Sequence, residues 1–235
     1  MELYDVTSST FSAREFTADP LPDATLHRIL DRARFAPSGG NRQGWRVIVV
    51  RDHAAREVIA AATRGPAKRY TAQSKVGENP WNTIDPPSVD AATIERTEPM
   101  QRLIDPVLKA PVVLVLCVDL KVVAAMDQYL DRVGVVGGAS VYPFAWNVMM
   151  AARHEGYGTN ITTLAVAEEP RLKAALGIPA HLAVAAIMPM GKPVKTLAQG
   201  FRKARIFRHH HLPLEVTAKS PGGSDISCSQ RRRSA

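Results

Sequence analysis

The sequence has few of the features that mark a membrane, secreted or metal-binding protein. No segment approaches the about 18 uninterrupted apolar residues of a membrane-spanning helix. Residues 1–5 (MELYD) include no apolar run, so we expect no signal peptide. The two cysteines, Cys117 and Cys228, are too few for a disulfide framework and show no metal-ligand spacing. These absences predict a cytoplasmic globular protein with no metal and no membrane association.

The sequence also lacks the signatures of a nucleic-acid-binding protein. It contains no internal repeat and no basic motif interleaved with aromatic residues of the kind that stacks bases. The net charge of +8 is unevenly distributed, because residues 201–235 carry eight Lys and Arg against two acids and so hold six of the eight charges. The excess belongs to a C-terminal arm and tail rather than to one face of the core, so we expect no nucleic-acid partner.

What the sequence does contain is enough apolar residues for a full core, 46% of 235 residues. Asp23 is a plausible N-cap of a helix whose apolar stripe includes Leu26 and Ile29. The apolar runs predict strands at 46–50, 111–118 and 182–188, and helices at 53–63, 91–109, 134–156 and 168–176. Three or four strands separated by helices indicate a layered α+β or α/β fold.

Two features interrupt this regular pattern. Residues 64–90 contain several Gly-Pro, Asn-Pro and Asp-Pro turn signals, which predict an irregular segment, either a functional lid or a mobile excursion. Tyr70 and Trp81 make this segment our candidate for a substrate lid. Pro143 lies inside the predicted helix 134–156 and predicts a kink or a break there.

The most informative segment is residues 36–45 (APSGGNRQGW), between the first helix and the first strand. It is longer and more polar than a helix-to-strand turn requires. Its polar side chains could converge with the backbone amides of Gly39 and Gly40, as in a loop that holds a flat, polar, anionic ligand. The side chains in question are Ser38, Asn41, Arg42 and Gln43. The alternative is a helix exit with chance polar residues.

Three other segments carry groups that suit an anionic ligand. Arg14 is either a solvated charge or a bidentate partner of phosphate. Lys203 and Arg205 lie two residues apart, so an extended arm would present them on one side, and the alternative is a solvated basic tail. Residues 156–164 (GYGTNITTL) contain a Gly-x-Gly that suits a ligand-binding turn, and the alternative for Gly156 is a helix C-cap.

In their order along the chain, these segments resemble the FMN-dependent nitroreductase family. The family pattern has an Arg-x-Ser-x-Arg-x-Phe segment, an Ala-Pro-Ser-x-x-Asn-x-Gln-Pro-Trp loop, a Gly-Leu-Gly-Thr segment, a Leu-Gly-Ile-Pro followed by Gly-x-Pro, and a late basic pair. Here these read TFSAREF at 10–16, APSGGNRQGW at 36–45, GYGT at 156–159, LGIP at 176–179 with GKP at 191–193, and KAR at 203–205.

The resemblance implies an α+β nitroreductase-like fold with a central, mostly antiparallel sheet flanked by helices. The FMN-binding domain would be 1–193, a C-terminal arm wrapping a partner subunit would be 194–214, and a basic, disordered tail would be 215–235. The resemblance implies that Arg14, Lys203 and Arg205 bind the FMN phosphate with the help of Ser12, and that Pro37, Ser38 and Gly39 shape the flavin edge. It also implies that Asn41 and Gln43 bind the pyrimidine ring or ribityl chain, and that the backbone near Thr163 and Leu164 faces the flavin N5.

The resemblance also implies an activity. NADPH or NADH would reduce FMN, and a nitroaromatic, quinone or similar flat acceptor would reoxidise it in a ping-pong cycle, with no side chain required as a general acid. The site would be shared in a homodimer. Alternatives within the same fold are a flavin-storage protein and a flavin-consuming or dehalogenating enzyme. The chain departs from the family pattern at Thr10, Gly44 and Pro143, where Gly44 in place of proline is expected to loosen the loop.

Overall fold

The computed structural model describes residues 1–196, 215–216 and 228–229. The chain divides into two units, Met1–Thr196 and Leu197–Ala235. The second unit is described only where β5 (Glu215–Val216) pairs antiparallel with β6 (Cys228–Ser229). Most of the predicted arm and tail therefore lies outside the described residues, and the first unit carries the fold.

A four-stranded sheet with the strand order β1-β2-β4-β3 forms the centre of the first unit. Every pair of neighbours is antiparallel. The strands are β1 (Trp45–Val50), β2 (Val112–Asp119), β3 (Gly158–Thr159) and β4 (Leu182–Gly191). The predicted α+β fold is confirmed, and the three predicted strands coincide with β1, β2 and β4.

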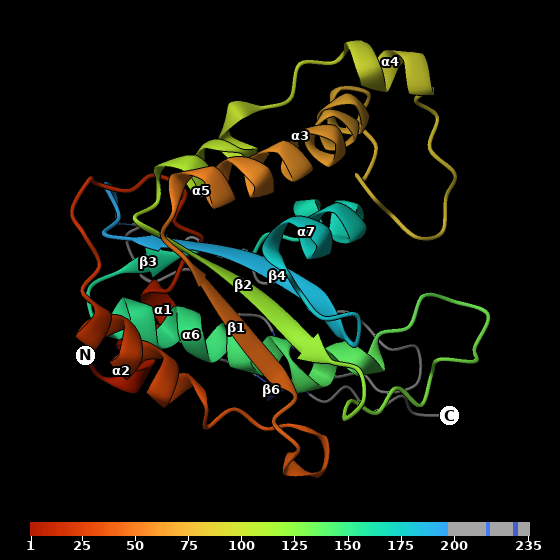
Figure 1. Cartoon of the computed structure of the whole chain (residues 1–235). Helices are drawn as coiled ribbons and strands as arrows, with labels where there is room; N and C mark the ends of the chain where they lie inside the picture. The colour runs from red at the N-terminus through yellow and green to blue at the C-terminus, as the bar shows by residue number, and fades with distance from the viewer. Residues whose placement is uncertain (197–214, 217–227, 230–235) are drawn as a thin grey trace. The chain divides into compact units, whose positions relative to one another are not determined.

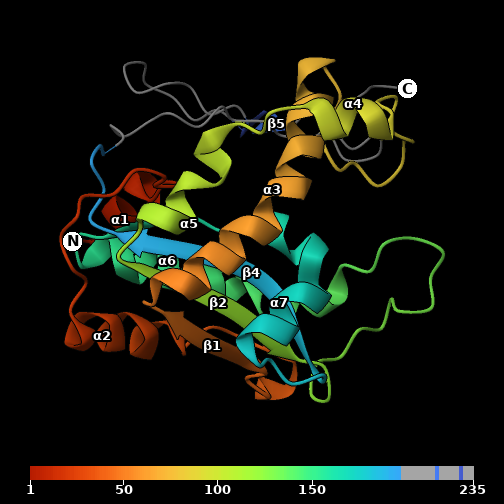
Figure 2. The same ribbon diagram turned by 45° about the horizontal axis from the view of Figure 1, so that its top comes forward.

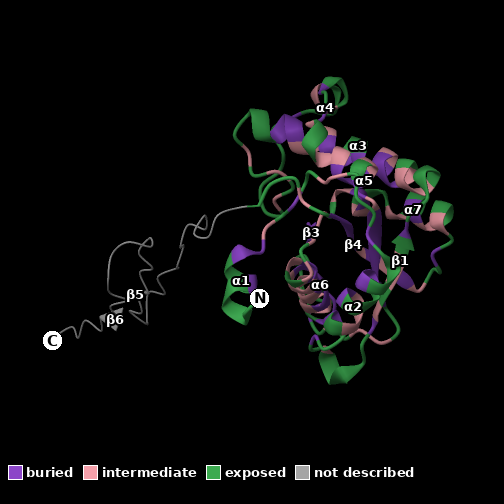
Figure 3. Cartoon of the chain, turned by 90° about the vertical axis from the view of Figure 1, so that its left-hand side faces the viewer, coloured by how far each residue is buried: buried purple, intermediate pink, exposed green. Residues whose placement is uncertain are grey.

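Helices cover both faces of this sheet (Figures 1 and 2). Every residue of β2 is buried, and successive side chains point to opposite faces. Val113 and Val115 pack against α3 (His53–Lys75), α5 (Asp105–Lys109) and α7 (Glu169–Leu176), whereas Leu114 and Leu116 pack against α2 (Asp23–Ala33) and α6 (Tyr142–His154). Figure 3 shows buried strand residues at the centre of the sheet, an exposed edge at β1, and helices that are exposed on their outer sides.

Shorter elements connect these layers. They are α1 (Leu3–Ser9), α4 (Ala91–Arg96) and the 3-10 turns η1 (Gly39–Asn41), η2 (Gln101–Leu103), η3 (Val136–Ser140) and η4 (Leu164–Glu168). Within the described ranges, no helix combines the length and the apolar character needed to cross a bilayer.

The prediction that regular structure stops at residue 64 was wrong. Helix α3 continues through Gly65 and Pro66 and ends at Lys75, so only 76–90 is irregular. A proline inside a helix removes one backbone hydrogen bond and crowds the preceding turn. Here Pro66 and Ala67 are buried, and α3 as a whole packs along α7 and η4, so tertiary packing offsets the local cost.

Two predicted helices are shorter than expected. Residues 91–109 form α4, η2 and α5 rather than one helix, and Pro99 disfavours helical backbone at Glu98. Of 134–156, only Tyr142–His154 is α-helical, so Pro143 lies in the first turn, where proline is tolerated, instead of kinking the helix.

The predicted cap at Asp23 was also wrong. The N-cap of α2 is Pro22, and the Asp23 carboxylate pairs instead with Nη2 of Arg51 at 2.5 Å. The two predicted helix ends are confirmed, because Gly156 and Gly177 follow α6 and α7 with φ of 83° and 64°, the left-handed backbone that glycine adopts without strain.

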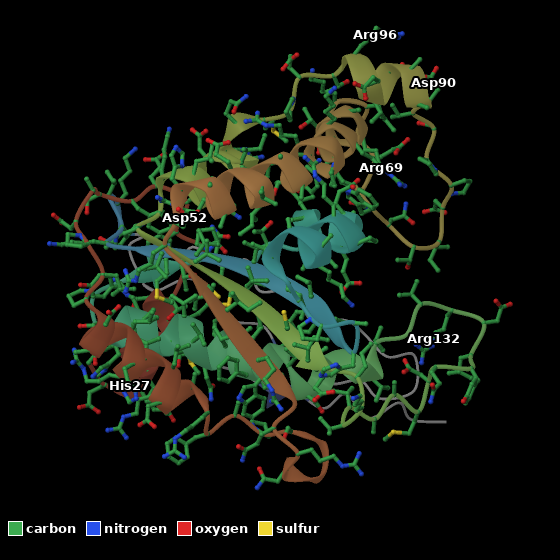
Figure 4. All side chains as sticks on the ribbon, in the orientation of Figure 1. His27, Asp52, Arg69, Asp90, Arg96 and Arg132 are labelled. Atoms are coloured by element: carbon green, nitrogen blue, oxygen red, sulfur yellow. The ribbon has the colours of Figure 1, made fainter. Side chains whose placement is uncertain are left out.

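The segment between β2 and η3 is organised by one buried carboxylate. Asp127 is 4% exposed, and its Oδ2 accepts the N–H of Val135 at 2.7 Å and pairs with Nη1 of Arg132 at 2.9 Å. Arg132 is labelled in Figure 4. The hydrogen bond from Val135, assisted by Arg132 and Val136, lowers the pKa of Asp127 from 3.8 to about 2.

This pKa predicts an acid-sensitive contribution to stability. Because the pKa in the folded chain lies below the ordinary value, the stabilisation is complete above about pH 4 and is lost as the pH falls toward 2. We expect the difference in unfolding free energy between the wild type and Asp127→Asn, measured by urea denaturation, to shrink over that window. A difference that is the same at pH 6 and pH 2.5 would contradict this assignment.

Candidate functional site

A cavity of about 620 Å³ lies within the first unit. Its wall combines the end of α3 and the segment after it, η2 and α5, the chain from Asn160 to η4, and the middle of β4. The lining residues are Arg14, Tyr70, Pro80, Trp81, Arg102, Leu103, Pro106, Val107, Tyr142, Asn160, Ile161, Thr162, Thr163, Leu164, Val166, Ala167, Val184 and Ala185. Ligand sites commonly have volumes of about 300–1,000 Å³, so this cavity is large enough for a cofactor-sized molecule.

A β-bulge shapes the sheet side of the cavity. Leu116 pairs with Ala186 and Cys117 with Val184, which leaves Ala185 without a partner on β2. The Ala185 carbonyl accepts a hydrogen bond from the Tyr142 hydroxyl at 3.2 Å. Bulges bend a strand and redirect its groups, often beside active sites. The bulge thus places Val184 and Ala185 in the cavity wall.

Arg14 brings a positive charge to the cavity. The preceding residue is fixed beside β3, because the Ala13 N–H donates to the Thr159 carbonyl at 3.1 Å and its carbonyl accepts from Nδ2 of the buried Asn160 at 2.7 Å. Among the described residues no acid forms an ion pair with Arg14, whose Nη1 donates only to the Ser12 carbonyl at 3.4 Å. The guanidinium is therefore available to an anionic ligand.

Backbone donors lie at the start of η4. Thr163 is its N-cap and Leu164 its first residue, and both line the cavity. The first N–H groups of a helical turn have no acceptor inside it. Neither of these two N–H groups donates to another described residue, so both can bind an acceptor on a ligand.

The predicted ligand loop is ordered around its own polar side chains. The Gln43 N–H donates to Ser38 Oγ, and Gln43 Nε2 donates to Asn41 Oδ1, both at 3.0 Å. Asn41 and Gln43 have φ of 53° and 50°, which is uncommon for residues other than glycine and is frequent at functional sites. The Gly39 N–H donates to Ser140 Oγ at 3.1 Å.

This loop lies apart from the cavity. It precedes β1 at one edge of the sheet, whereas Arg14 follows the residues that pair with β3 at the other edge. Three strand spacings of about 4.8 Å place these edges about 14 Å apart. One chain therefore brings together Arg14, Thr163 and Leu164 of the predicted binding residues. Ser12 and the loop residues Pro37, Ser38, Gly39, Asn41 and Gln43 do not line the cavity, and Lys203 and Arg205 lie outside the described residues.

Gly44 anchors the loop by close packing. It is buried, and its carbonyl accepts the Asp119 N–H at 2.8 Å. A Cβ atom at this position would lie 2.9 Å from Cγ2 of Val122, which is too close without displacement.

We therefore expect Gly44→Ala to lower the unfolding free energy by about 1–3 kcal/mol through overpacking. The matched control is Gly65→Ala, because a Cβ there meets no atom within 4 Å and replaces a glycine inside α3. In Gly65→Ala the unfolding free energy should rise by about 0.5–1 kcal/mol. Urea denaturation of both variants measures the contrast, and equal shifts would contradict the packing argument.

Sequence reasoning identified part of the cavity wall and missed the rest. Tyr70 and Trp81, the lid candidates, both line the cavity. Arg102, Tyr142 and Asn160 were missed. Asn160 lay within the Gly-x-Gly segment already singled out, whereas Arg102 fell in a stretch predicted as continuous helix and gave no separate signal.

Comparisons with known proteins agree with this architecture. The sequence profile of the Nitroreductase family matches residues 8–192. An NADH dehydrogenase of Thermus thermophilus is 27% identical over 209 residues, covering 87% of this chain and 88% of that protein. Iodotyrosine deiodinase 1 of Rattus norvegicus is 25% identical, covering 82% of this chain and 62% of its own length. The crystal structure of oxidized iodotyrosine deiodinase bound to FMN and 3-iodo-L-tyrosine superposes with a TM-score of 0.63 at 20% identity, covering 88% and 98% of the two chains.

Proposed function

The chain belongs to the nitroreductase family, and we propose that it is an FMN-dependent oxidoreductase that uses NADPH or NADH to reduce flat acceptors such as nitroaromatics and quinones. The observation that carries this proposal is the cavity lined by Arg14, which has no ion pair with a described acid, and by Thr163 and Leu164, whose N–H groups donate to no other described residue. The relative named NADH dehydrogenase supports a nicotinamide reductant, and the FMN in the similar deiodinase structure supports the cofactor.

The residues of the cavity suit FMN. Arg14 would pair with the phosphate, and the N–H groups of Thr163 and Leu164 would donate to the polar edge of the ring and stabilise negative charge there. When bound, FMN supplies the hydride chemistry. The apolar side chains of α5 and η4 would exclude water from the ring. No side chain is assigned a proton-transfer step.

We further propose that a second copy of the chain completes the site. The loop side chains Asn41 and Gln43 are polar, exposed and held in uncommon backbone conformations, yet they lie at the sheet edge remote from Arg14. A homodimer that places the loop of one subunit against the cavity of the other would use them. In this proposal, residues 1–193 form the binding domain, the arm 194–214 supplies Lys203 and Arg205 to the phosphate, and 215–235 forms a tail.

The visible spectrum of the purified protein tests this function. We expect flavin absorbance bands that bleach on anaerobic addition of NADPH or NADH and return when a quinone or a nitroaromatic is added. A colourless protein that does not bind added FMN would exclude the proposal. Bound FMN that neither NADPH nor NADH reduces would favour a flavin-storage role instead.

A second candidate is reductive dehalogenation of an aromatic substrate. Relatives from rat and mouse, 25% and 24% identical, are named iodotyrosine deiodinase 1. The assay is halide release from 3-iodotyrosine by the chemically reduced protein. Halide release that outpaces reduction of nitroaromatics and quinones would favour this candidate over the first.

A further inference from the structure

We propose that Tyr70, Trp81 and Arg102 form an acceptor wall that selects flat aromatic molecules bearing an anionic group, such as a carboxylate. All three side chains line the cavity, from the end of α3, the segment after it and η2. The inference rests on the proposed function, because it names the class of acceptor that the same site prefers.

Trp81 is held in place by a network centred on a buried amide. The backbone N–H of Trp81 donates to Oε1 of Gln73 at 3.2 Å, and Gln73 is only 2% exposed. Gln73 Nε2 donates in turn to Oε2 of Glu78 at 2.8 Å, and the other oxygen of Glu78 accepts the Ser88 N–H at 2.7 Å. The network ties the backbone of Trp81 to α3 and to Ser88, so hydrogen bonds hold the part of the segment that carries Trp81.

Two further observations mark Trp81 as a ligand contact. Its φ of 59° is a strained conformation for a bulky residue, and such strain concentrates at binding sites. The Arg69 guanidinium lies 4.1 Å from the indole centroid and covers one ring face (Arg69 is labelled in Figure 4). Trp81 as a whole residue is still 37% exposed and lines the cavity, so it offers surface on which an aromatic ring can stack.

The charge of the cavity favours an anion. Its lining contains two arginines and no aspartate or glutamate among the described residues. Arg14 is assigned to the cofactor phosphate, which leaves Arg102. Arg102 is exposed, has no ion pair with a described acid, and makes only a 3.5 Å contact from Nη2 to Met100 Sδ. A guanidinium binds a carboxylate through two parallel hydrogen bonds to its two oxygens, whereas a neutral amide offers a single acceptor oxygen and no charge.

The test compares 4-nitrobenzoate with its neutral analogue 4-nitrobenzamide. We expect the holoenzyme to prefer the carboxylate in kcat/KM, and Arg102→Gln to lose about 10- to 100-fold for the carboxylate with little change for the amide, because one charge-assisted contact is removed. The matched control is Arg96→Gln, since Arg96 lies on α4 outside the cavity lining (Figure 4). Trp81→Leu should weaken both acceptors.

A binding measurement separates this inference from the proposed function. Benzoate, which cannot be reduced, should quench tryptophan fluorescence in the wild type but not in Trp81→Leu, and should bind about 10- to 100-fold more weakly to Arg102→Gln. If the enzyme reduces menadione with NADH but binds benzoate no better than benzamide, the acceptor wall is wrong and the function stands. If FMN does not bind, the function is wrong, and the fluorescence titration still decides whether the wall binds an aromatic anion.

Discussion

Arg14→Ala is expected to lower the affinity for FMN by about 2–5 kcal/mol if bound FMN buries the pair between Arg14 and its phosphate, which is roughly 30- to 4,000-fold in the dissociation constant. The reason is geometric and electrostatic. Arg14 is fixed at the cavity by the bonds of Ala13 to Thr159 and Asn160, and no described acid neutralises it. Removing the guanidinium would leave a phosphate dianion without this partner. Fluorescence titration of the apoprotein with FMN measures the change.

The control for this result is Arg34→Ala. Arg34 is also exposed, but it pairs with Asp31 at 2.7 Å and does not line the cavity. Arg34→Ala changes the net charge by the same amount as Arg14→Ala. Comparing the two variants therefore separates the loss of a local contact with FMN from a general loss of positive charge. Equal FMN affinity in Arg14→Ala and Arg34→Ala would overturn the phosphate assignment.

The second large effect is expected from mixing two inactive chains. If the loop of one subunit completes the cavity of the other, Arg14→Ala and the double variant Asn41→Ala, Gln43→Ala should each lose FMN as homodimers. A heterodimer of the two would contain one site with all of the changes and one site with none. We therefore expect co-expressed, doubly tagged heterodimers to regain about half of the wild-type FMN content and NAD(P)H oxidation, since half of their sites are intact.

This experiment distinguishes a shared site from a self-contained one. If each chain built its own site, every site in the heterodimer would carry a lesion and no FMN would be recovered. The control is a mixture of the two variant homodimers, purified separately and combined under conditions in which subunits do not exchange. Recovery in that control would show instead that one of the lesions is too weak to test the proposal.

The strands of this protein were predictable because their information is local. The apolar runs at β1, β2 and β4 are stable only where helices shield them from water, and in the structure β2 has buried side chains on both faces of the sheet. Gly156 and Gly177 ended their helices as predicted, because a left-handed residue is a requirement of the chain itself. Arg14, Thr163 and Leu164 were identified through motif order and do meet at one cavity.

The errors arose where long-range packing overrides local preference. Gly65 and Pro66 disfavour a helix, but α3 continues because Pro66 and Ala67 are buried and the helix packs along α7 and η4. Pro143 looks like a helix breaker until the helix is seen to begin one residue earlier.

By itself, the sequence indicated which segments carry ligand chemistry: a polar loop, an arginine ahead of the first long helix and, through the family resemblance, the backbone near Thr163 and Leu164. Each of these properties belongs to a few consecutive residues. Only the tertiary structure decided which segments meet in one chain. It brought Arg14 and Thr163 to the same cavity, separated both from the loop at Asn41, and added Arg102 to the cavity wall that Trp81 also lines. The physical reason is that proximity across a sheet depends on strand order and on the packing of distant helices, and no local pattern records either.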